Sequence, residues 1–332
     1  MQINKAVLQI FDFTSSLAVY SEHELKVSDE GIQTYLQTHV DKAFKDPGAR
    51  TGYLHSDSLL GKRLSAYANG SLNLVDVAKE IGEKLFSYMA QATDPLVMDV
   101  IFCEAMGESP YLCLLECQAH DAYTHQLFSE EDGSLTTELV QHKAVLPTVT
   151  QKLRAFFAIR LSDFAVHVFE PKGEYDGEVT YILADKVLQI GTEQSSKETI
   201  KKIRTIVNQI AQAHESDGVA EISLTKELIA KNAEVSDSLN PVELIERVFN
   251  HNPVQQSAAK KELEELHMVK ELLVSREFAS KIGQNHKIKT DTGIEISFPV
   301  EYTKNKEFME IVTNADGTLR IELKNISKIT NK

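Results

Sequence analysis

Between residues 96 and 183 the chain consists of short apolar runs, and their spacing restricts the possible folds more than any other feature. Leu96–Ala105 and Tyr111–Gln118 have strand length and are joined by a turn-forming segment, 106–110. Similar runs follow: Tyr123–Phe128, Leu139–Leu146, Ala155–Leu161, Ala165–Glu170 and Val179–Leu183. Short breaks, such as 130–133 and 172–174, separate them. Runs of strands that follow runs of helices predict an α+β fold with an antiparallel sheet, not alternating strands and helices.

The N-terminal part is predicted to supply two strands and several helices. Lys5–Phe13 predicts a buried strand and Ser16–Leu25 a second one that turns polar. Ser28-Asp29-Glu30 then places a cap and acids ahead of a helix that runs to about Phe44. Ser56–Asn69 and Ser71–Ala90 predict a pair of helices, since apolar residues recur in the second at helical spacing. Residues 1–191 therefore predict an α+β domain.

Beyond residue 191 the pattern is mostly helical. Ser195-x-x-Glu198 is a capping box that predicts the start of a helix. Its apolar stripe recurs at helical spacing: Ile200, Ile203, Val207 and Ile210. Further helices are predicted to begin at Asn240-Pro241 and at Pro253, the latter running toward Phe278. With hairpin turns at 290–293 and 314–317, residues 192–332 predict a smaller helical domain that ends in β-hairpins.

The first of these hairpins, His286–Val300, is predicted to have two different faces. After the turn, alternate residues place an apolar set on one side: Ile294, Ile296, Phe298 and Val300. Before the turn, Lys287 and Lys289 share a face opposite Ile288. One side must therefore be buried, and the other carries two ammonium groups.

Charge limits the partners that such a chain attracts. The formal net charge of −14 argues against non-specific attraction to nucleic acid or to anionic lipid. Residues 1–257 contain 22 Lys and Arg against 37 Asp and Glu, whereas residues 258–332 contain 13 against 12. Charge effects are screened over about 8–10 Å at physiological salt, so any surface that binds DNA must be a local one.

Several features predict a cytoplasmic protein. No segment approaches the roughly 18 consecutive apolar residues of a membrane span, and the N-terminus lacks a secretory pattern. Cys103, Cys113 and Cys117 lie in apolar runs, as reduced core thiols do. A metal site would require loop spacing of the Cys-x-x-Cys kind and a fourth ligand, so no metal or cofactor is predicted.

Five basic residues are candidates for contacts with DNA phosphates. Lys197, Lys201 and Arg204 recur at steps of four and three and share one helix face. An ordinary solvated face is the alternative interpretation, and it applies equally to Lys287 and Lys289. A two-stranded ribbon does, however, fit the major groove of DNA.

A dimer is expected as well. Lys260–Val274 has apolar residues among Glu and Lys, which fits either a dimer seam or packing within its own domain.

Catalytic motifs give little support for an enzyme. Asp291-Thr292-Gly293 spells the signature of aspartic proteases, whose chemistry needs two facing carboxylates. The chain has one copy, so a homodimer would have to supply the second; an ordinary turn is the simpler interpretation. Phosphate-binding loops, dinucleotide fingerprints, zinc-protease motifs and nucleophile elbows do not occur in the sequence. No catalytic residue is predicted, and a homodimeric protease that uses Asp291 remains a remote alternative.

Three segments resemble the bacterial nucleoid-associated protein family of the NdpA/YejK type. They are 3–10, 142–153, and 287–294 with 298–300 and 316–319. They span nearly the whole chain in the order found in the family. The resemblance implies a cytoplasmic protein found with the nucleoid, which binds DNA directly or through nucleoid proteins and has no known catalytic residues.

Two functional hypotheses follow from these observations. In the first, the five basic residues of the second domain bind DNA with little sequence selectivity. In the second, the protein is an adaptor whose acidic N-terminal domain captures basic nucleoid proteins.

Overall fold

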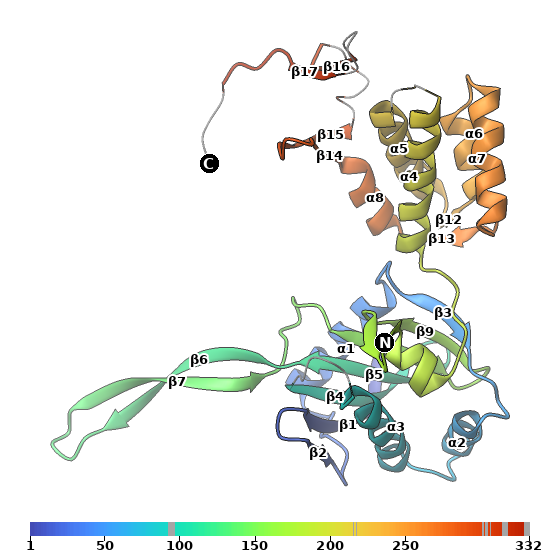
Figure 1. The fold of residues 1–332 in the computed structure, drawn as a ribbon. Coiled ribbons are helices and arrows are strands. Elements are labelled where there is room, and N and C mark those ends of the chain that lie inside the picture. The colour runs from blue at the N-terminus through green and yellow to red at the C-terminus, as the bar shows by residue number, and fades with distance from the viewer. Residues whose placement is uncertain are drawn as a thin grey trace. The chain divides into compact units, whose positions relative to one another are not determined.

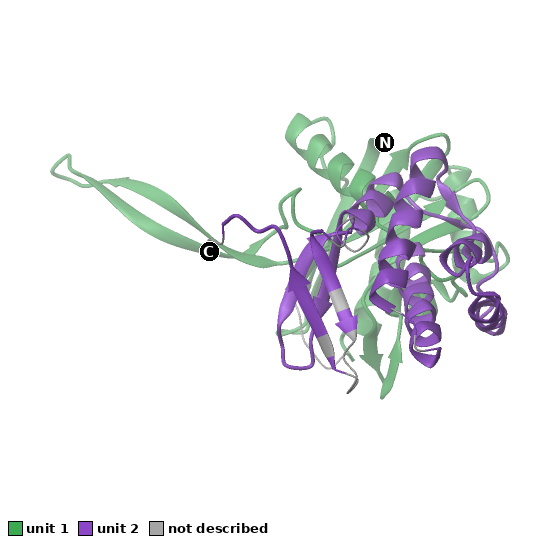
Figure 2. Cartoon of the chain, turned by 90° about the horizontal axis from the view of Figure 1, so that it is seen from above, with its two compact units in different colours: residues 1–195 green, residues 196–332 purple. Residues whose placement is uncertain are grey.

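A computed structural model describes residues 1–91, 97–214, 216, 218–300, 302, 305, 307–313 and 318–328 (Figure 1). The chain divides into two compact units, Met1–Ser195 and Ser196–Lys332 (Figure 2). The predicted domain boundary at residue 191 lies close to this division. The predicted hairpin turn at 314–317 lies outside the described residues.

Unit 1 is built on a seven-stranded sheet in which all neighbouring strands are antiparallel. From edge to edge the strands are β2 (Leu17–Tyr20), β1 (Gln2–Asp12), β4 (Val97–Met106), β5 (Pro110–Gln118), β8 (Ala155–Arg160), β9 (Ala165–Phe169) and β3 (Arg50–Tyr53). Its helices are α1 (Glu30–Phe44), α2 (Leu59–Ala68), α3 (Leu74–Met89) and the π-helical segment η1 (Ile182–Leu188). The predicted α+β class and the antiparallel sheet are confirmed.

Helices cover both faces of this sheet. Phe102, Leu114 and Phe157 belong to the core that contains α2, α3 and η1. Their chain neighbours point the other way, and Leu115 and Phe156 belong to the core against α1. Because β4, β5 and β8 are buried on both faces, their sequences are continuous apolar runs, unlike the alternation typical of a half-exposed antiparallel strand.

The three cysteines lie in the core against α1, and all are free and buried. Cys103 and Cys113 are directly opposite each other in the register of β4 and β5. Burial raises the pKa of the Cys117 thiol to about 12 and also raises the pKa of Cys113. The prediction of reduced thiols in the core is therefore confirmed.

Two local features of unit 1 differ from expectation. The prediction of a strand at Val179–Leu183 is wrong, because η1 begins at Ile182. Only Glu178–Thr180 is extended; it forms β11 and pairs with β10 (Gly173–Tyr175). The Glu170 carboxylate accepts hydrogen bonds from the N–H groups of Leu183 (2.6 Å) and Ala184 (2.9 Å), which stabilises the start of this helix.

Strand β3 was not predicted from the sequence. It holds Gly52, where a Cβ would lie 2.6 Å from the carbonyl oxygen of Gly191. The close approach of these two backbones explains why a glycine interrupts this strand.

A long two-stranded arm lies between β5 and β8 in the sequence. It consists of β6 (His120–Ser129) and β7 (Leu135–Val145), which pair with each other. In Figure 1 the arm extends well away from the body of unit 1. β5 and β8 are nevertheless adjacent in the sheet, so the arm is an elaborated connection between two neighbouring strands.

Unit 2 is mostly helical, as predicted. Its helices are α4 (Ser196–Ala213), α5 (Gly218–Val235), α6 (Pro241–Val248), α7 (Pro253–Glu265) and α8 (Arg276–Gln284). Its strand pairs are β12 (Ser238–Leu239) with β13 (Leu272–Leu273), β14 (Asn285–Lys289) with β15 (Glu295–Pro299), and β16 (Met309–Thr313) with β17 (Leu319–Leu323).

Two helical predictions in this unit need correction. The stretch expected to run from Pro253 toward Phe278 is divided into α7 and α8 by β13. Leu263 is fully buried in the core of unit 2, so this part of the proposed seam packs within its own domain. Helix α5 was not predicted, because Ser223, Thr225 and Lys226 lie on its buried side and replace the apolar stripe that signals a helix.

The two-sided core of unit 1 predicts a large loss of stability on truncation of a central strand. Leu114→Ala removes a fully buried side chain from β5 and is expected to lower the free energy of unfolding by about 3 kcal/mol in urea titrations. The control Leu59→Ala changes a side chain that is 83% exposed, so its effect should stay within about 0.5 kcal/mol. Equal effects of the two substitutions would contradict this description of the core.

Candidate nucleic-acid interface

Helix α4 exposes a row of lysines on the side opposite its buried stripe. Ile200, Ile203 and Val207 are buried, and the helix packs on α5 and α7. Lys197 and Lys201 are exposed, as the sequence spacing predicts, and Lys202 is exposed beside them. Residues 196–213 contain four Lys or Arg and one acidic residue, Glu198. This helix is therefore a local basic element in an acidic protein.

Arg204 does not share that exposure. It is partly buried, and its Nε atom is buried without a hydrogen-bond partner. Burial lowers the pKa of its guanidinium group. The structure thus separates Arg204 from Lys197 and Lys201, although helical spacing puts the three on one face.

Arg204 instead belongs to a buried basic cluster with Lys226 of α5 and His286 of β14. Lys226 is 5% exposed, and its Nζ donates a hydrogen bond to the carbonyl oxygen of Asn285 (3.1 Å). Burial, and next the charge of Arg204, lower the pKa of Lys226 to about 8. The members lie close enough to repel one another, since the charges of Lys226 and Arg204 also lower the pKa of His286.

His286 attaches the ribbon β14–β15 to helix α5. Its Nδ1 lies 2.6 Å from the hydroxyl oxygen of Ser223, and its ring stacks on Phe298 with a centroid distance of 5.4 Å. Helix α8, which leads into β14, also packs closely on α5: a Cβ at Gly283 would lie 2.4 Å from the Cβ of Ala230. The ribbon is thus held at α5 from two directions.

The exposed face of the ribbon carries the two predicted lysines. Lys287 is opposite Ser297 and Lys289 is opposite Glu295, so all four side chains share one face. Lys287 and Lys289 are exposed, and Phe298 on the other face is buried. The Nζ of Lys287 lies 2.5 Å from a carboxylate oxygen of Glu295, which neutralises part of the positive charge.

Asp291 lies in the turn of this ribbon. Its carboxylate is exposed and accepts a hydrogen bond from the N–H of Thr292 (2.9 Å). Gly293 has a φ of 90°, and its N–H donates to the carbonyl oxygen of Thr290 (3.1 Å). The interpretation of this segment as a turn is confirmed.

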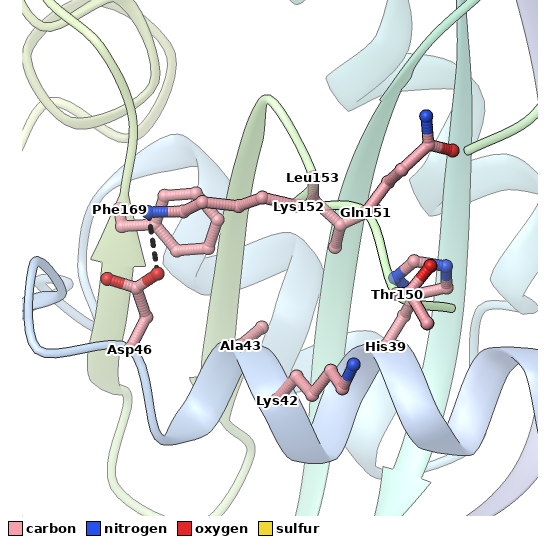
Figure 3. A pocket seen from close by; sticks show the side chains of 9 residues that line it. All are labelled: His39, Lys42, Ala43, Asp46, Thr150, Gln151, Lys152, Leu153 and Phe169. Carbon is pink, nitrogen blue, oxygen red and sulfur yellow. Dashed lines mark ion pairs between the residues drawn. The ribbon is translucent and has the colours of Figure 1, made fainter. Parts of the chain in front are cut away.

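Unit 1 has a small pocket of about 140 Å³ between α1 and the segment 150–153 (Figure 3). Its two lysines are already engaged. Lys42 donates to the carbonyl oxygen of Val149 (2.5 Å), and Lys152 lies over the ring of Phe169 and pairs with Asp46 at 2.6 Å. These contacts hold the segment 150–153 against α1.

The described residues contain no group of three or more His, Cys, Asp or Glu placed to hold a metal ion. Among the described helices, none is both long enough and apolar enough to cross a membrane.

Comparison with known families agrees with the resemblance found in the sequence. A family model described as nucleoid-associated protein YejK matches residues 8–330. The chain belongs to this family. The match includes the five predicted basic residues, the arm and the ribbon. A search of curated proteins found no match.

The sequence did not reveal the roles of Lys226 and His286. Lys226 lies on a helix without an apolar stripe, and so it gave no signal of burial. His286 offered one usable clue, because the alternation of β14 places it on the same side as Ile288 and opposite the two lysines.

The buried imidazole predicts a specific dependence of stability on pH. The pKa of His286 is lowered from 6.5 to about 4, chiefly by burial and then by Lys226 and Arg204. Below pH 6.5 the unfolded chain therefore binds a proton that the folded chain does not bind until about pH 4. Stability should fall by on the order of 3 kcal/mol as the pH drops through this range.

Urea titrations between these pH values test that expectation. His286→Asn should remove this part of the pH dependence, whereas His251→Asn, at an exposed site, should leave it unchanged. An unaltered pH dependence in His286→Asn would refute the assignment.

Proposed function

We propose that the protein associates with DNA through the exposed basic residues of unit 2, with little sequence selectivity and without catalysis. The observation that carries this proposal is the uneven charge. Residues 1–195 contain 15 Lys and Arg against 28 Asp and Glu, whereas residues 196–332 contain 20 against 21. Membership of a nucleoid-associated family supports the same function and a location in the cytoplasm, at the nucleoid.

Lys197 and Lys201 of α4, with Lys287 and Lys289 of the ribbon, are the proposed phosphate contacts. All four are exposed, and ammonium groups bind phosphate as point charges at any base sequence. Arg204 is partly buried and contributes through the buried basic cluster, whose charge acts in a medium of low dielectric constant. Contacts of this kind position DNA without reading its bases, which is why low selectivity follows.

The acidic unit 1 supports a second candidate, an adaptor that recruits basic nucleoid proteins. Its excess of carboxylates repels phosphate and attracts Lys-rich and Arg-rich surfaces. The two candidates differ in which unit carries the interaction. Charge reversal in unit 2 should abolish DNA binding and leave the capture of a basic partner intact.

Fluorescence anisotropy of a labelled duplex of about 30 bp, measured at about 50 and 200 mM salt, tests direct binding. Four or five phosphate contacts predict micromolar binding at the lower salt that weakens by roughly 10²-fold at the higher. Lys197→Glu with Lys201→Glu should weaken binding at least about 10-fold and reduce the salt dependence.

The matched control is Lys62→Glu with Lys79→Glu, which makes the same change of charge at exposed positions of unit 1. This variant should bind like the unmodified protein. Absence of binding at low salt, or equal losses in the two variants, would refute direct binding through α4 and leave the adaptor hypothesis.

The ion pair on the ribbon allows a test in the opposite direction. Glu295→Gln removes the carboxylate 2.5 Å from Lys287, so it should strengthen DNA binding by about 3-fold to 10-fold and steepen the salt dependence. Glu277→Gln on α8, where a carboxylate pairs with Lys281 (2.7 Å), is the control and should change little. Unchanged affinity in Glu295→Gln would show that the ribbon does not contact DNA.

A further inference from the structure

A buried polar atom without a partner lines the pocket between α1 and the segment 150–153 (Figure 3). His39 of α1 is 2% exposed, and its Nε2 atom makes no hydrogen bond. The ring does have a hydrogen bond to the backbone of Pro147. Because proline has no backbone N–H, the ring is the donor and the carbonyl oxygen is the acceptor, and the donating atom is Nδ1.

The imidazole of His39 therefore keeps a lone pair on Nε2. A neutral imidazole has a single N–H, and here that proton is on Nδ1. Burial lowers the pKa of His39, so the ring is neutral at about pH 7.5. A buried acceptor that lacks a donor is costly, and a ligand that donates a hydrogen bond to Nε2 removes this cost.

The charged groups of the pocket favour an anion. Among the residues that line it, Lys42 and Lys152 are basic and Asp46 is acidic, so positive charge is in excess. Unit 1 as a whole has the opposite balance, with 15 Lys and Arg against 28 Asp and Glu. Each ammonium group has three N–H donors and uses one of them, toward the carbonyl of Val149 or the carboxylate of Asp46. Two donors on each lysine are left for a ligand.

The size of the pocket restricts the ligand to a small molecule. Its volume of about 140 Å³ exceeds the roughly 10–15 Å³ that one water needs, and it is below the roughly 300 Å³ at which pockets for drug-sized ligands begin. An oxyanion of the size of phosphate or of a short hydroxy acid lies between these limits. Leu153 and Phe169 form an apolar part of the wall, which lowers the local dielectric constant and strengthens polar contacts inside the pocket.

We propose that this pocket binds a small oxyanion that carries a hydroxyl group, and that hydrogen phosphate is the simplest such ligand. The ammonium groups of Lys42 and Lys152 bind its charged oxygens, and its hydroxyl donates a hydrogen bond to Nε2 of His39. A phosphodiester of DNA has no hydroxyl to donate. The site is therefore separate from the DNA contacts proposed for unit 2, and binding there does not depend on them.

Isothermal titration calorimetry of the full chain at about pH 7.5 tests the proposal with two pairs of anions. Phosphate and sulfate are similar in size and charge, but at this pH only phosphate retains a hydroxyl, and glycolate differs from acetate in the same way. Phosphate should bind with a Kd between about 10 μM and 1 mM, and sulfate at least about 10-fold more weakly.

The second pair distinguishes the source of the hydroxyl. A preference for glycolate over acetate, with phosphate the weaker ligand, would assign the pocket to a hydroxy acid, whereas tighter binding of phosphate would assign it to inorganic phosphate. The proposal is overturned if neither hydroxylated anion saturates the protein below about 10 mM, or if neither is preferred over its matched anion.

Lys42→Met removes one of the two ammonium groups and should weaken phosphate binding at least about 10-fold. Lys45→Met is the matched control, because it removes the same charge from an exposed position at the end of α1 that does not line the pocket. The ion pair between Lys152 and Asp46 still holds the segment 150–153 in both variants. Equal affinities of the two variants for phosphate would show that the anion binds elsewhere.

His39→Gln tests the lone pair directly. The amide of Gln presents either a donor or an acceptor, so phosphate and sulfate should bind this variant with affinities within about 3-fold of each other. A folded His39→Gln protein that still prefers phosphate at least about 10-fold would contradict the role of Nε2. The two anion pairs and Lys42→Met, at an exposed residue, test the site without any change to a buried side chain.

Discussion

The burial of β4, β5 and β8 on both faces is the constraint on which the rest of unit 1 depends. Alternate residues of these strands point into two separate cores, one against α1 and the other against α2, α3 and η1. A sheet of this kind cannot be stable with either layer missing, because roughly half of its apolar side chains would then face water. Helices α1, α2 and α3 precede the central strands in sequence and contribute to both layers, and η1, which follows these strands, completes the second layer. This requirement explains why an antiparallel sheet has the continuous apolar strands usually found in parallel sheets.

Much of this architecture could be predicted because local and tertiary requirements agree. Asp29 caps α1 in the structure, and its carboxylate accepts hydrogen bonds from the N–H groups of Gly31 and Ile32. The elements that escaped prediction are those in which local signals conflict with the tertiary structure. Helix α5 buries polar residues, and η1 begins within a segment whose sequence is typical of a strand. Strand β3 contains Gly52, where the backbone of Gly191 comes too close for a Cβ.

The candidate interface likewise has some features that the local sequence predicts and others that it does not. Exposure of Lys197 and Lys201 follows from the helical period of α4. The inward position of Arg204 does not, because it depends on α5 and β14, which come from distant parts of the sequence. The pairing of Lys287 with Glu295 depends on the register of the ribbon, which the turn at 290–293 fixes. Charge counts alone therefore overstate how many cations are free to meet a phosphate.

The arm connects two neighbouring strands of the sheet, and this position affects how its length and sequence can change. β5 and β8 are adjacent and antiparallel, so a short turn could join them, yet 36 residues lie between Gln118 and Ala155. Each doubling of a connection's length costs only about 0.6 kcal/mol in closure entropy. Evolution can therefore lengthen, shorten or re-sequence this insertion while the folded body stays the same. The segment 130–134 at its tip is accordingly a natural position for grafting a foreign peptide.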